Sequence, residues 1–225
     1  MTSACRVHEE WMTEVSRAAR LRQCRAVNLH RLPAPAVELL CHPATPCGEP
    51  LRLQVRLAAA GSEDGPGLVL HYALSGDVSA LRLPAPTTPG PADGLWQNSC
   101  FEAFIGASGD TAYREFNFSP SGQWAAYRFS SERVRDPASE TRIDPVMNWQ
   151  SSSDGLSLQV WLPLHALPPV HPERSWDLGL SAVIQTTDGQ LSYWALRHPG
   201  ARPDFHHRGG WLPQPDLPAL FLPVT

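Results

Sequence analysis

Lysine is absent from this chain of 225 residues, so arginine supplies all 18 of its basic side chains. The 22 acidic residues outnumber them and leave a formal net charge of −4 at pH 7. The arginines are scattered, and their densest grouping is the loose one between Arg17 and Arg25. Binding to a phosphate backbone requires clustered basic residues. The sequence therefore predicts no nucleic-acid partner.

Long apolar runs are missing too. The first twenty residues carry Glu9, Glu10, Glu14 and Arg17, which leave no apolar core for a signal peptide. No stretch approaches the apolar length of a membrane span. No CxxC pair occurs, which argues against zinc knuckles and thioredoxin-type motifs. The five cysteines are Cys5, Cys24, Cys41, Cys47 and Cys100. We expect a cytoplasmic protein with reduced thiols and no membrane partner.

Proline, in contrast, is abundant, with 23 residues. Because proline breaks helix interiors, this composition favours short strands and many fixed turns. Apolar and polar residues alternate from Leu51 to Ala58, as in a half-buried strand. Comparable strand patterns follow at 68–74, 78–83, within 95–129, and at 146–149, 156–162, 178–185 and 191–196. About ten strands without helix–strand alternation predict an all-β fold, an antiparallel two-sheet β-sandwich.

Three segments outside these strands are predicted to lack regular structure. The proline-rich stretch 32–50 is read as an extended lead-in, and 84–94 and 130–145 as surface loops. By contrast, Thr186–Gln190 contains Asp-Gly, which suits a tight hairpin turn.

The N-terminal segment differs from the rest of the chain. Val7, Trp11, Val15 and Ala18 recur at helical spacing with charged residues between them. We therefore divide the chain into an N-terminal extension, 1–28, with one amphipathic helix, and a β-sandwich domain, 29–225. Whether the helix docks on the domain is left open.

Four segments carry a family resemblance: LWQNSCFEAFI (95–105), YREFNFSPSGQWAAYRF (113–129), LGLSAVIQTTDGQLSYWAL (178–196) and HPGARPDFHHR (198–208). They resemble the bacterial DOMON-like domains, which are related to the family 9 carbohydrate-binding modules. The resemblance covers roughly residues 36–222. It implies a β-sandwich that binds a sugar or, in other branches, haem. Sugar-binding relatives hold a terminal sugar between two tryptophans with charged residues on its hydroxyls, and they often carry structural calcium.

Glu102 is the first candidate site residue. In Cys100–Ile105, Phe101 and Ile105 fall on one face with Ala103, while Glu102 lies among apolar neighbours on the other. A carboxylate there needs a partner, because burying an unpaired charge is unfavourable. Either it forms a structural ion pair with an arginine, or it binds a ligand in a pocket.

The next strand adds Tyr113, Glu115 and Asn117 on one face. One aromatic ring, one acid and one amide in a row suit a polyol ligand. The alternative is an ordinary solvated sheet face.

Trp96, Trp124 and Trp194 are the tryptophans that we select as candidate ligand platforms. Trp96 follows the proline-rich loop, whereas the other two lie in predicted strands. Most tryptophans in a domain of this kind pack in the core, so each is either a core residue or a platform.

The last candidate group follows the strand that bears Trp194. Its members are polar and lie close together in one loop: Arg197, His198, Arg202, Asp204, His206, His207 and Arg208. Of these, Arg197, His198, Asp204, His206 and His207 are the candidate site residues. They can anchor the loop through hydrogen bonds, hold a metal, or border a ligand site. No HExxH-type spacing occurs, and we predict no metal.

The preferred function is a non-catalytic domain that binds a carbohydrate or similar polar small molecule. The alternative is an enzyme that uses Glu102 or Glu115 as a proton donor near His198. No GxSxG elbow or phosphate-binding glycine loop is present. A third option, haem, requires two axial ligands, for which Met147 with a histidine is the candidate pair. The sequence leaves the ligand and the oligomeric state open.

Overall fold

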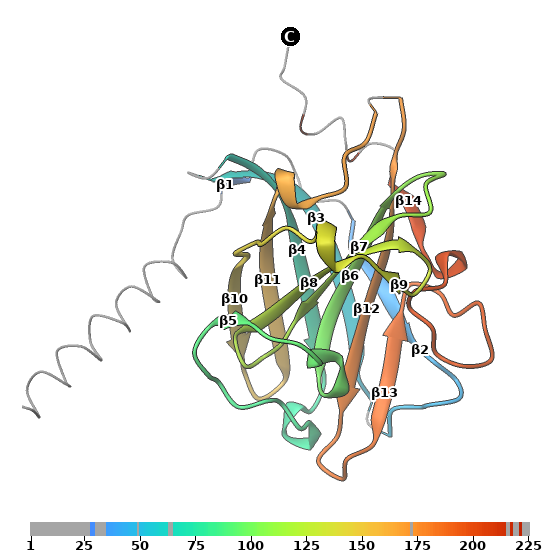
Figure 1. Cartoon of the computed structure of the whole chain (residues 1–225). Helices are drawn as coiled ribbons and strands as arrows, with labels where there is room; N and C mark the ends of the chain where they lie inside the picture. The colour runs from blue at the N-terminus through green and yellow to red at the C-terminus, as the bar shows by residue number, and fades with distance from the viewer. Residues whose placement is uncertain are drawn as a thin grey trace, which may run out of the picture.

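The computed structural model describes residues 28–29, 35–48, 50–62, 65–171, 173–214, 217 and 221. In this part of the chain nearly all regular structure is strand (Figure 1). The strands are β1 (Asn28–Leu29), β2 (Val37–Cys41), β3 (Arg52–Ser62), β4 (Gly65–Ser75), β5 (Gly90–Pro91), β6 (Cys100–Ala107), β7 (Tyr113–Phe118), β8 (Gln123–Ser131), β9 (Val134–Arg135), β10 (Val146–Ser151), β11 (Gly155–Pro163), β12 (Trp176–Gln185), β13 (Leu191–Ala195) and β14 (Leu212–Gln214).

The described helices are single turns of 3-10 type: η1 (Val78–Ala80), η2 (Leu95–Gln97), η3 (Pro137–Ser139), η4 (Leu164–Ala166) and η5 (Arg208–Gly210). Within the ranges that the structure covers, no helix is long and apolar enough to cross a membrane. The amphipathic helix expected in 1–28 falls outside the described residues, apart from Asn28 in β1. The all-β class is thus confirmed for the described part.

The predicted pair of separate antiparallel sheets needs correction. The described strands form one continuous sheet in the order β10-β11-β4-β3-β2-β13-β12-β6-β7-β8-β5, and β1, β14 and β9 pair onto β3, β12 and β8. The link is β2, which pairs with β3 at one edge and with β13 at the other. The sheet is also mixed, because β5 runs parallel to β8. This link could not be predicted from the sequence, because β2 lies in the proline-rich stretch 32–50, which was predicted to be extended without regular structure.

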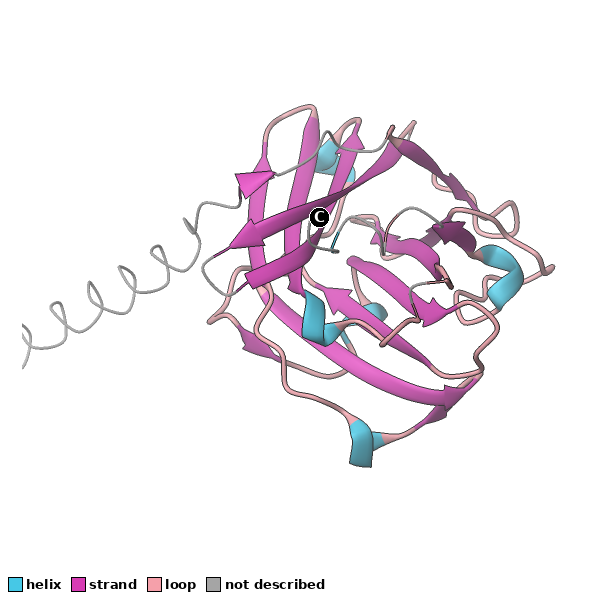
Figure 2. Cartoon of the chain, turned by 90° about the horizontal axis from the view of Figure 1, so that it is seen from above, coloured by secondary structure: helices cyan, strands magenta, loops and turns pink. Residues whose placement is uncertain are grey.

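The sheet curls so that its two halves face each other (Figure 2). Aliphatic side chains from both halves fill the space between them and are almost completely buried. Leu53 and Leu70 come from one half, and Ile105 and Leu178 from the other. This core is the main apolar contact that holds the curl closed.

Two local predictions have opposite outcomes. The expected strand at 78–83 is wrong: Asp77 accepts a hydrogen bond from the Ser79 N–H at 2.9 Å and caps η1 instead. An aspartate at this position favours a helical turn over continued strand. The hairpin turn at 186–190 is confirmed, with Gly189 at φ 88° between β12 and β13.

Candidate functional site

Strand β6 presents two different faces, as its alternation predicts. Phe101, Ala103 and Ile105 point into the core between the two halves of the sheet. Glu102 and Phe104 point to the opposite side of the sheet, where Phe104 packs in a separate aromatic cluster. The candidate site residue of β6, Glu102, therefore lies on the face that points away from the main core.

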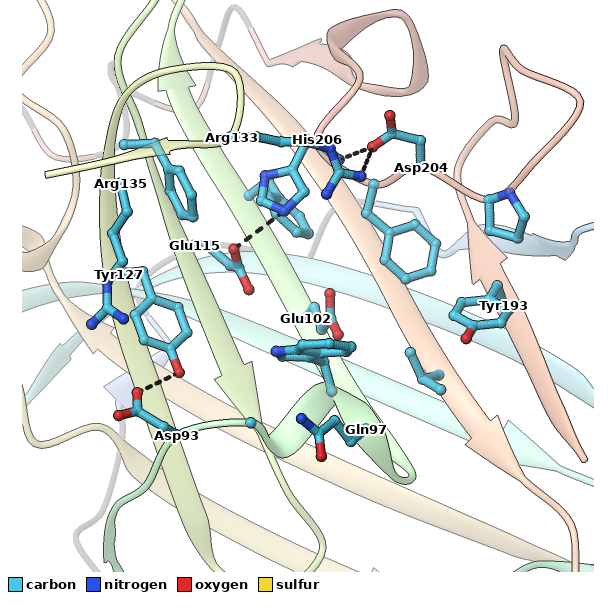
Figure 3. A pocket seen from close by; sticks show the side chains of 17 residues that line it. Asp93, Gln97, Glu102, Glu115, Tyr127, Arg133, Arg135, Tyr193, Asp204 and His206 are labelled. Atoms are coloured by element: carbon cyan, nitrogen blue, oxygen red, sulfur yellow. Dashed lines mark hydrogen bonds and ion pairs between the residues drawn. The ribbon is translucent and has the colours of Figure 1, made fainter. Parts of the chain in front are cut away.

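A pocket of about 620 Å³ opens on this face (Figure 3). Its floor comes from β6, β7 and β8, and its walls come from η2, the β8–β9 turn and the loop after β13. The lining residues combine acids, arginines and aromatic rings: Asp93, Gly94, Trp96, Gln97, Glu102, Phe104, Glu115, Tyr127, Phe129, Arg133, Arg135, Val183, Tyr193, Pro203, Asp204, Phe205 and His206.

Glu102 lies on the pocket floor with 2% of its surface exposed. Its Oε1 atom is buried and has no hydrogen-bond partner among the described residues. Burial, and then the negative charge of Glu115, raise the pKa of Glu102 well above its usual value. The arginine partner expected for a structural ion pair does not appear in the described part of the chain.

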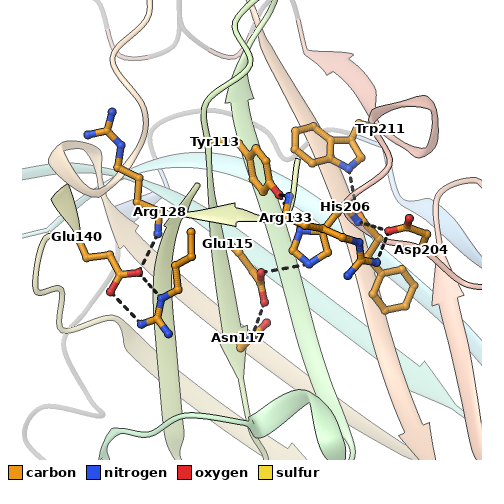
Figure 4. Close-up of polar contacts among 11 residues, drawn as sticks. Tyr113, Glu115, Asn117, Arg128, Arg133, Glu140, Asp204, His206 and Trp211 are labelled. Carbon is orange, nitrogen blue, oxygen red and sulfur yellow. Dashed lines mark hydrogen bonds and ion pairs between the residues drawn. The ribbon is translucent and has the colours of Figure 1, made fainter. Parts of the chain in front are cut away.

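Glu115 is the second acid of the floor. Its Oε1 accepts a hydrogen bond from Asn117 Nδ2 at 2.8 Å, and its Oε2 lies 3.7 Å from His206 Nε2 (Figure 4). Burial raises the pKa of Glu115 to about 7, although Asn117, Arg133 and Arg135 act in the opposite direction. A solvated sheet face is excluded for this row, because Tyr113, Glu115 and Asn117 are all buried.

His206 receives its orientation from Tyr113. The Tyr113 hydroxyl lies 2.7 Å from His206 Nδ1 and accepts a hydrogen bond from the Arg133 N–H at 3.1 Å. Burial, followed by the charge of Arg133, lowers the pKa of His206 to about 4, so the ring is neutral at pH 7. A neutral ring that accepts the tyrosine proton at Nδ1 carries its own proton on Nε2, facing Glu115.

The loop after β13 is fixed to the β8–β9 turn by Asp204. Its Oδ1 accepts hydrogen bonds from Arg133 Nη2 at 2.7 Å and from the His206 N–H at 3.1 Å. Arg133 adopts a left-handed backbone conformation with φ 59°. This contact holds His206 over the floor.

On the side of the pocket formed by β8, Tyr127 donates a hydrogen bond to Asp93 Oδ1 at 2.8 Å. Arg135 lies over the Tyr127 ring, 4.3 Å from its centroid, and pairs with Glu140 at 2.7 Å. Trp96 on η2 completes this side and is 51% exposed. An exposed indole beside a polar floor is an open surface for a flat ligand.

The structure thus brings together five of the predicted residues as pocket lining: Trp96, Glu102, Glu115, Asp204 and His206. Tyr113 and Asn117 stand directly behind them as hydrogen-bond partners of His206 and Glu115.

The other five predicted residues lie away from the pocket. Trp124 donates to the Ile143 carbonyl at 3.1 Å and Trp194 to Ser192 Oγ at 3.0 Å, and both rings belong to the main core. Arg197, His198 and His207 do not line the pocket either.

Those two histidines, both in the loop after β13, have structural contacts. His198 Nε2 lies 2.7 Å from the Leu40 carbonyl, and its ring packs edge-on against His42. His207 accepts from the Gly209 N–H and caps η5. Across the described ranges, no three His, Cys, Asp or Glu side chains converge as a metal site requires. Met147, named for haem, lies in β10 and packs against the core.

Sequence reasoning missed several lining residues. Asp93, Arg133 and Arg135 fall in or beside segments read as plain loops, and their positions depend on the curl of the sheet. Tyr127 could have been predicted, because the alternation of β8 places it directly opposite Glu115 in the sheet. No sequence pattern identified Tyr193 as a lining residue, apart from its position next to Trp194.

No family model and no curated protein matches this chain. A solved structure from Bacteroides uniformis, described as that of a candidate carbohydrate-binding protein, superposes with a TM-score of 0.58 at 17% identity. That match covers 78% of this chain and 83% of the other. A family 9 carbohydrate-binding module from Caldicellulosiruptor kristjanssonii, solved in complex with glucose, gives a TM-score of 0.44 at 9% identity, covering 89% and 83%. At such identities the first likeness shows a shared fold.

Proposed function

We propose that this chain is a non-catalytic carbohydrate-binding domain that holds a sugar in the pocket on the outer face of β6, β7 and β8. The observation that carries this proposal is the half-exposed indole of Trp96 beside a floor that bears Glu102 and Glu115. A sugar ring has an apolar face that packs on an aromatic ring and hydroxyls that hydrogen-bond to carboxylates.

The size of the pocket supports the same ligand class. Ligand pockets usually measure about 300–1,000 Å³, so the observed 620 Å³ suits a mono- or disaccharide. The floor is preformed, because Asn117 and His206 hold Glu115 in position. A preformed site loses less conformational entropy when a ligand binds.

The shared fold with the Bacteroides uniformis protein supports the proposal, since that protein is described as a candidate carbohydrate binder. We also infer that the chain is a DOMON-like relative of family 9 modules and that it is cytoplasmic. Both inferences rest on sequence patterns alone.

The test is isothermal titration calorimetry of the protein with a panel of mono- and disaccharides. We expect saturable heat from at least one of them and loss of that heat in Trp96→Ala. A correctly folded protein that gives no heat with any sugar would refute the proposal.

A second candidate function is acid–base catalysis in the same pocket. The observation in its favour is the pKa of Glu115, raised to about 7, beside a second buried acid. A carboxyl group with such a pKa transfers protons efficiently near neutral pH. Release of nitrophenol from a panel of nitrophenyl glycosides, abolished by Glu115→Gln, would favour this function over simple binding.

A further inference from the structure

Three buried oxygen atoms in and behind the pocket floor lack hydrogen-bond partners among the described residues: Glu102 Oε1, Asn117 Oδ1 and Ser181 Oγ. Glu102 is paired with Asn117 on β7 and with Ser181 on β12. Directly paired residues share a sheet face, with Cβ atoms about 4.5–5.5 Å apart. The three oxygens therefore form one row centred on Glu102. Because unpaired buried polar atoms are unfavourable, such a row favours a ligand that donates hydrogen bonds.

The charges around this row also leave the acids without a cationic partner. Arg133 is paired with Asp204 at 2.7 Å, and Arg135 with Glu140 at the same distance. None of the ion pairs formed among the described residues involves Glu102. His206, whose Nε2 lies 3.7 Å from Glu115 Oε2, is neutral at pH 7, and Arg133 and Arg135 act on Glu115 only from a longer distance while paired with other acids. The floor therefore accepts a positive charge more readily than a negative one.

The aromatic lining of the pocket reinforces this preference. The faces of aromatic rings attract cations, and six rings line the floor and the walls: Trp96, Phe104, Tyr127, Phe129, Tyr193 and Phe205. One of these rings already shows the effect, because the Arg135 guanidinium lies 4.3 Å above Tyr127. Acids on the floor with aromatic rings around them form a typical binding site for an ammonium group.

We propose that the ligand of this pocket carries a protonated amino group that binds against Glu102, as an amino sugar does. This inference rests on the proposed carbohydrate-binding function and narrows its ligand class. An ammonium group has three N–H donors and no acceptor, which matches a row of oxygens. An ammonium group also supplies the counter-charge that favours ionisation of the buried Glu102 carboxyl, whereas a neutral hydroxyl offers one donor and no charge.

The test compares glucosamine, glucose and N-acetylglucosamine by isothermal titration calorimetry at about pH 6.5, where the free amine is protonated. N-acetylglucosamine keeps a nitrogen substituent at the same carbon but has no charge. We expect glucosamine to bind at least about tenfold more tightly than either neutral sugar. Equal affinity for glucosamine and glucose would overturn the inference and leave sugar binding intact.

A second matched pair, cyclohexylamine and cyclohexanol, separates the two proposals. If no sugar binds but cyclohexylamine binds and cyclohexanol does not, the ammonium site stands and the carbohydrate function is refuted. If no sugar, cyclohexylamine or cyclohexanol gives heat, both proposals are refuted.

The substitution Glu102→Gln identifies the residue responsible. Glutamine keeps the volume and one acceptor but removes the charge, so the preference for glucosamine should fall to about threefold or less. Glu38→Gln, an exposed acid away from the pocket, changes net charge equally and should keep the preference. A folded Glu102→Gln that retains the tenfold preference would overturn the inference. If that variant does not fold, Ser181→Ala tests the same row and should weaken glucosamine more than glucose.

Discussion

Replacement of Glu115 by glutamine should make the protein more stable at alkaline pH. Burial raises the pKa of this carboxyl from 4.5 to about 7, so the folded state binds the proton more tightly than the unfolded state. For a raised pKa, the stabilising contribution is fully present below about pH 4.5 and is lost as the pH rises through 7. Glutamine cannot ionise and avoids this loss.

The pKa difference sets the expected magnitude. A rise from 4.5 to about 7 corresponds to about 3 kcal/mol of unfolding free energy lost between about pH 4.5 and pH 8.5. Glutamine also keeps an oxygen that can accept the hydrogen bond from Asn117 Nδ2. The stability of Glu115→Gln relative to the parent should therefore rise by up to about 3 kcal/mol over this pH range.

The assay is urea unfolding, followed by tryptophan fluorescence, of parent and variant at about pH 4.5 and about pH 8.5. Glu38→Gln is the matched control, since Glu38 is 48% exposed and pairs with Arg52 at the surface. Its stability difference from the parent should change little between the two pH values. If the difference between parent and Glu115→Gln is the same at both pH values, the reasoning about the buried acid is refuted.

Two further substitutions test other residues of the site, and a third tests the packing of β12 against Trp211. Trp96→Ala should weaken sugar binding about 10- to 100-fold with little change in stability, because the ring is 51% exposed; calorimetry and thermal unfolding measure the two effects. Tyr113→Phe removes the donor to His206 Nδ1 and should cost about 1–3 kcal/mol in urea unfolding. Gly179→Ala would place a Cβ 2.5 Å from the Trp211 ring and should cost about 1–3 kcal/mol by the same assay.

Each of these has a control or a contradicting result. Leu40→Ala removes an apolar side chain that is 54% exposed outside the pocket, and it should leave sugar affinity unchanged. A Tyr113→Phe protein as stable as the parent would show that the tyrosine–histidine contact is not needed. Gly48→Ala, where a new Cβ meets nothing within 4 Å, should be neutral, and an equal loss there would contradict the steric reasoning for Gly179.

Much of the fold follows from local alternation, which the chain displays clearly. The faces of β6 and β7 were predictable because successive side chains of a strand point to opposite faces, which separates Glu102 from Phe101 and Ala103, and Glu115 from Phe116. The continuity of the sheet could not be predicted, because the linking strand β2 lies in a proline-rich segment and its pairing with β13 is a long-range contact. Local patterns carry no information on such pairings.

The residues of the candidate site also fall into a predictable group and an unpredictable one. Residues on the floor strands were identified from their place in an alternating pattern, as with Glu102. The wall residues could not be identified from the sequence. Asp93 and Arg133 reach the pocket only through the curl of the sheet and the ion pair between Arg133 and Asp204. Trp194 shows the reverse error, since its strand was correct but its ring faces the core.

The most direct test of the central claim is a crystal structure of the protein grown with a saturating concentration of the tightest-binding sugar from the calorimetric panel. The sugar ring is predicted to lie against Trp96, with polar groups within hydrogen-bond distance of Glu102 or Glu115. A sugar bound elsewhere on the protein, with this pocket free of it, would contradict the claim.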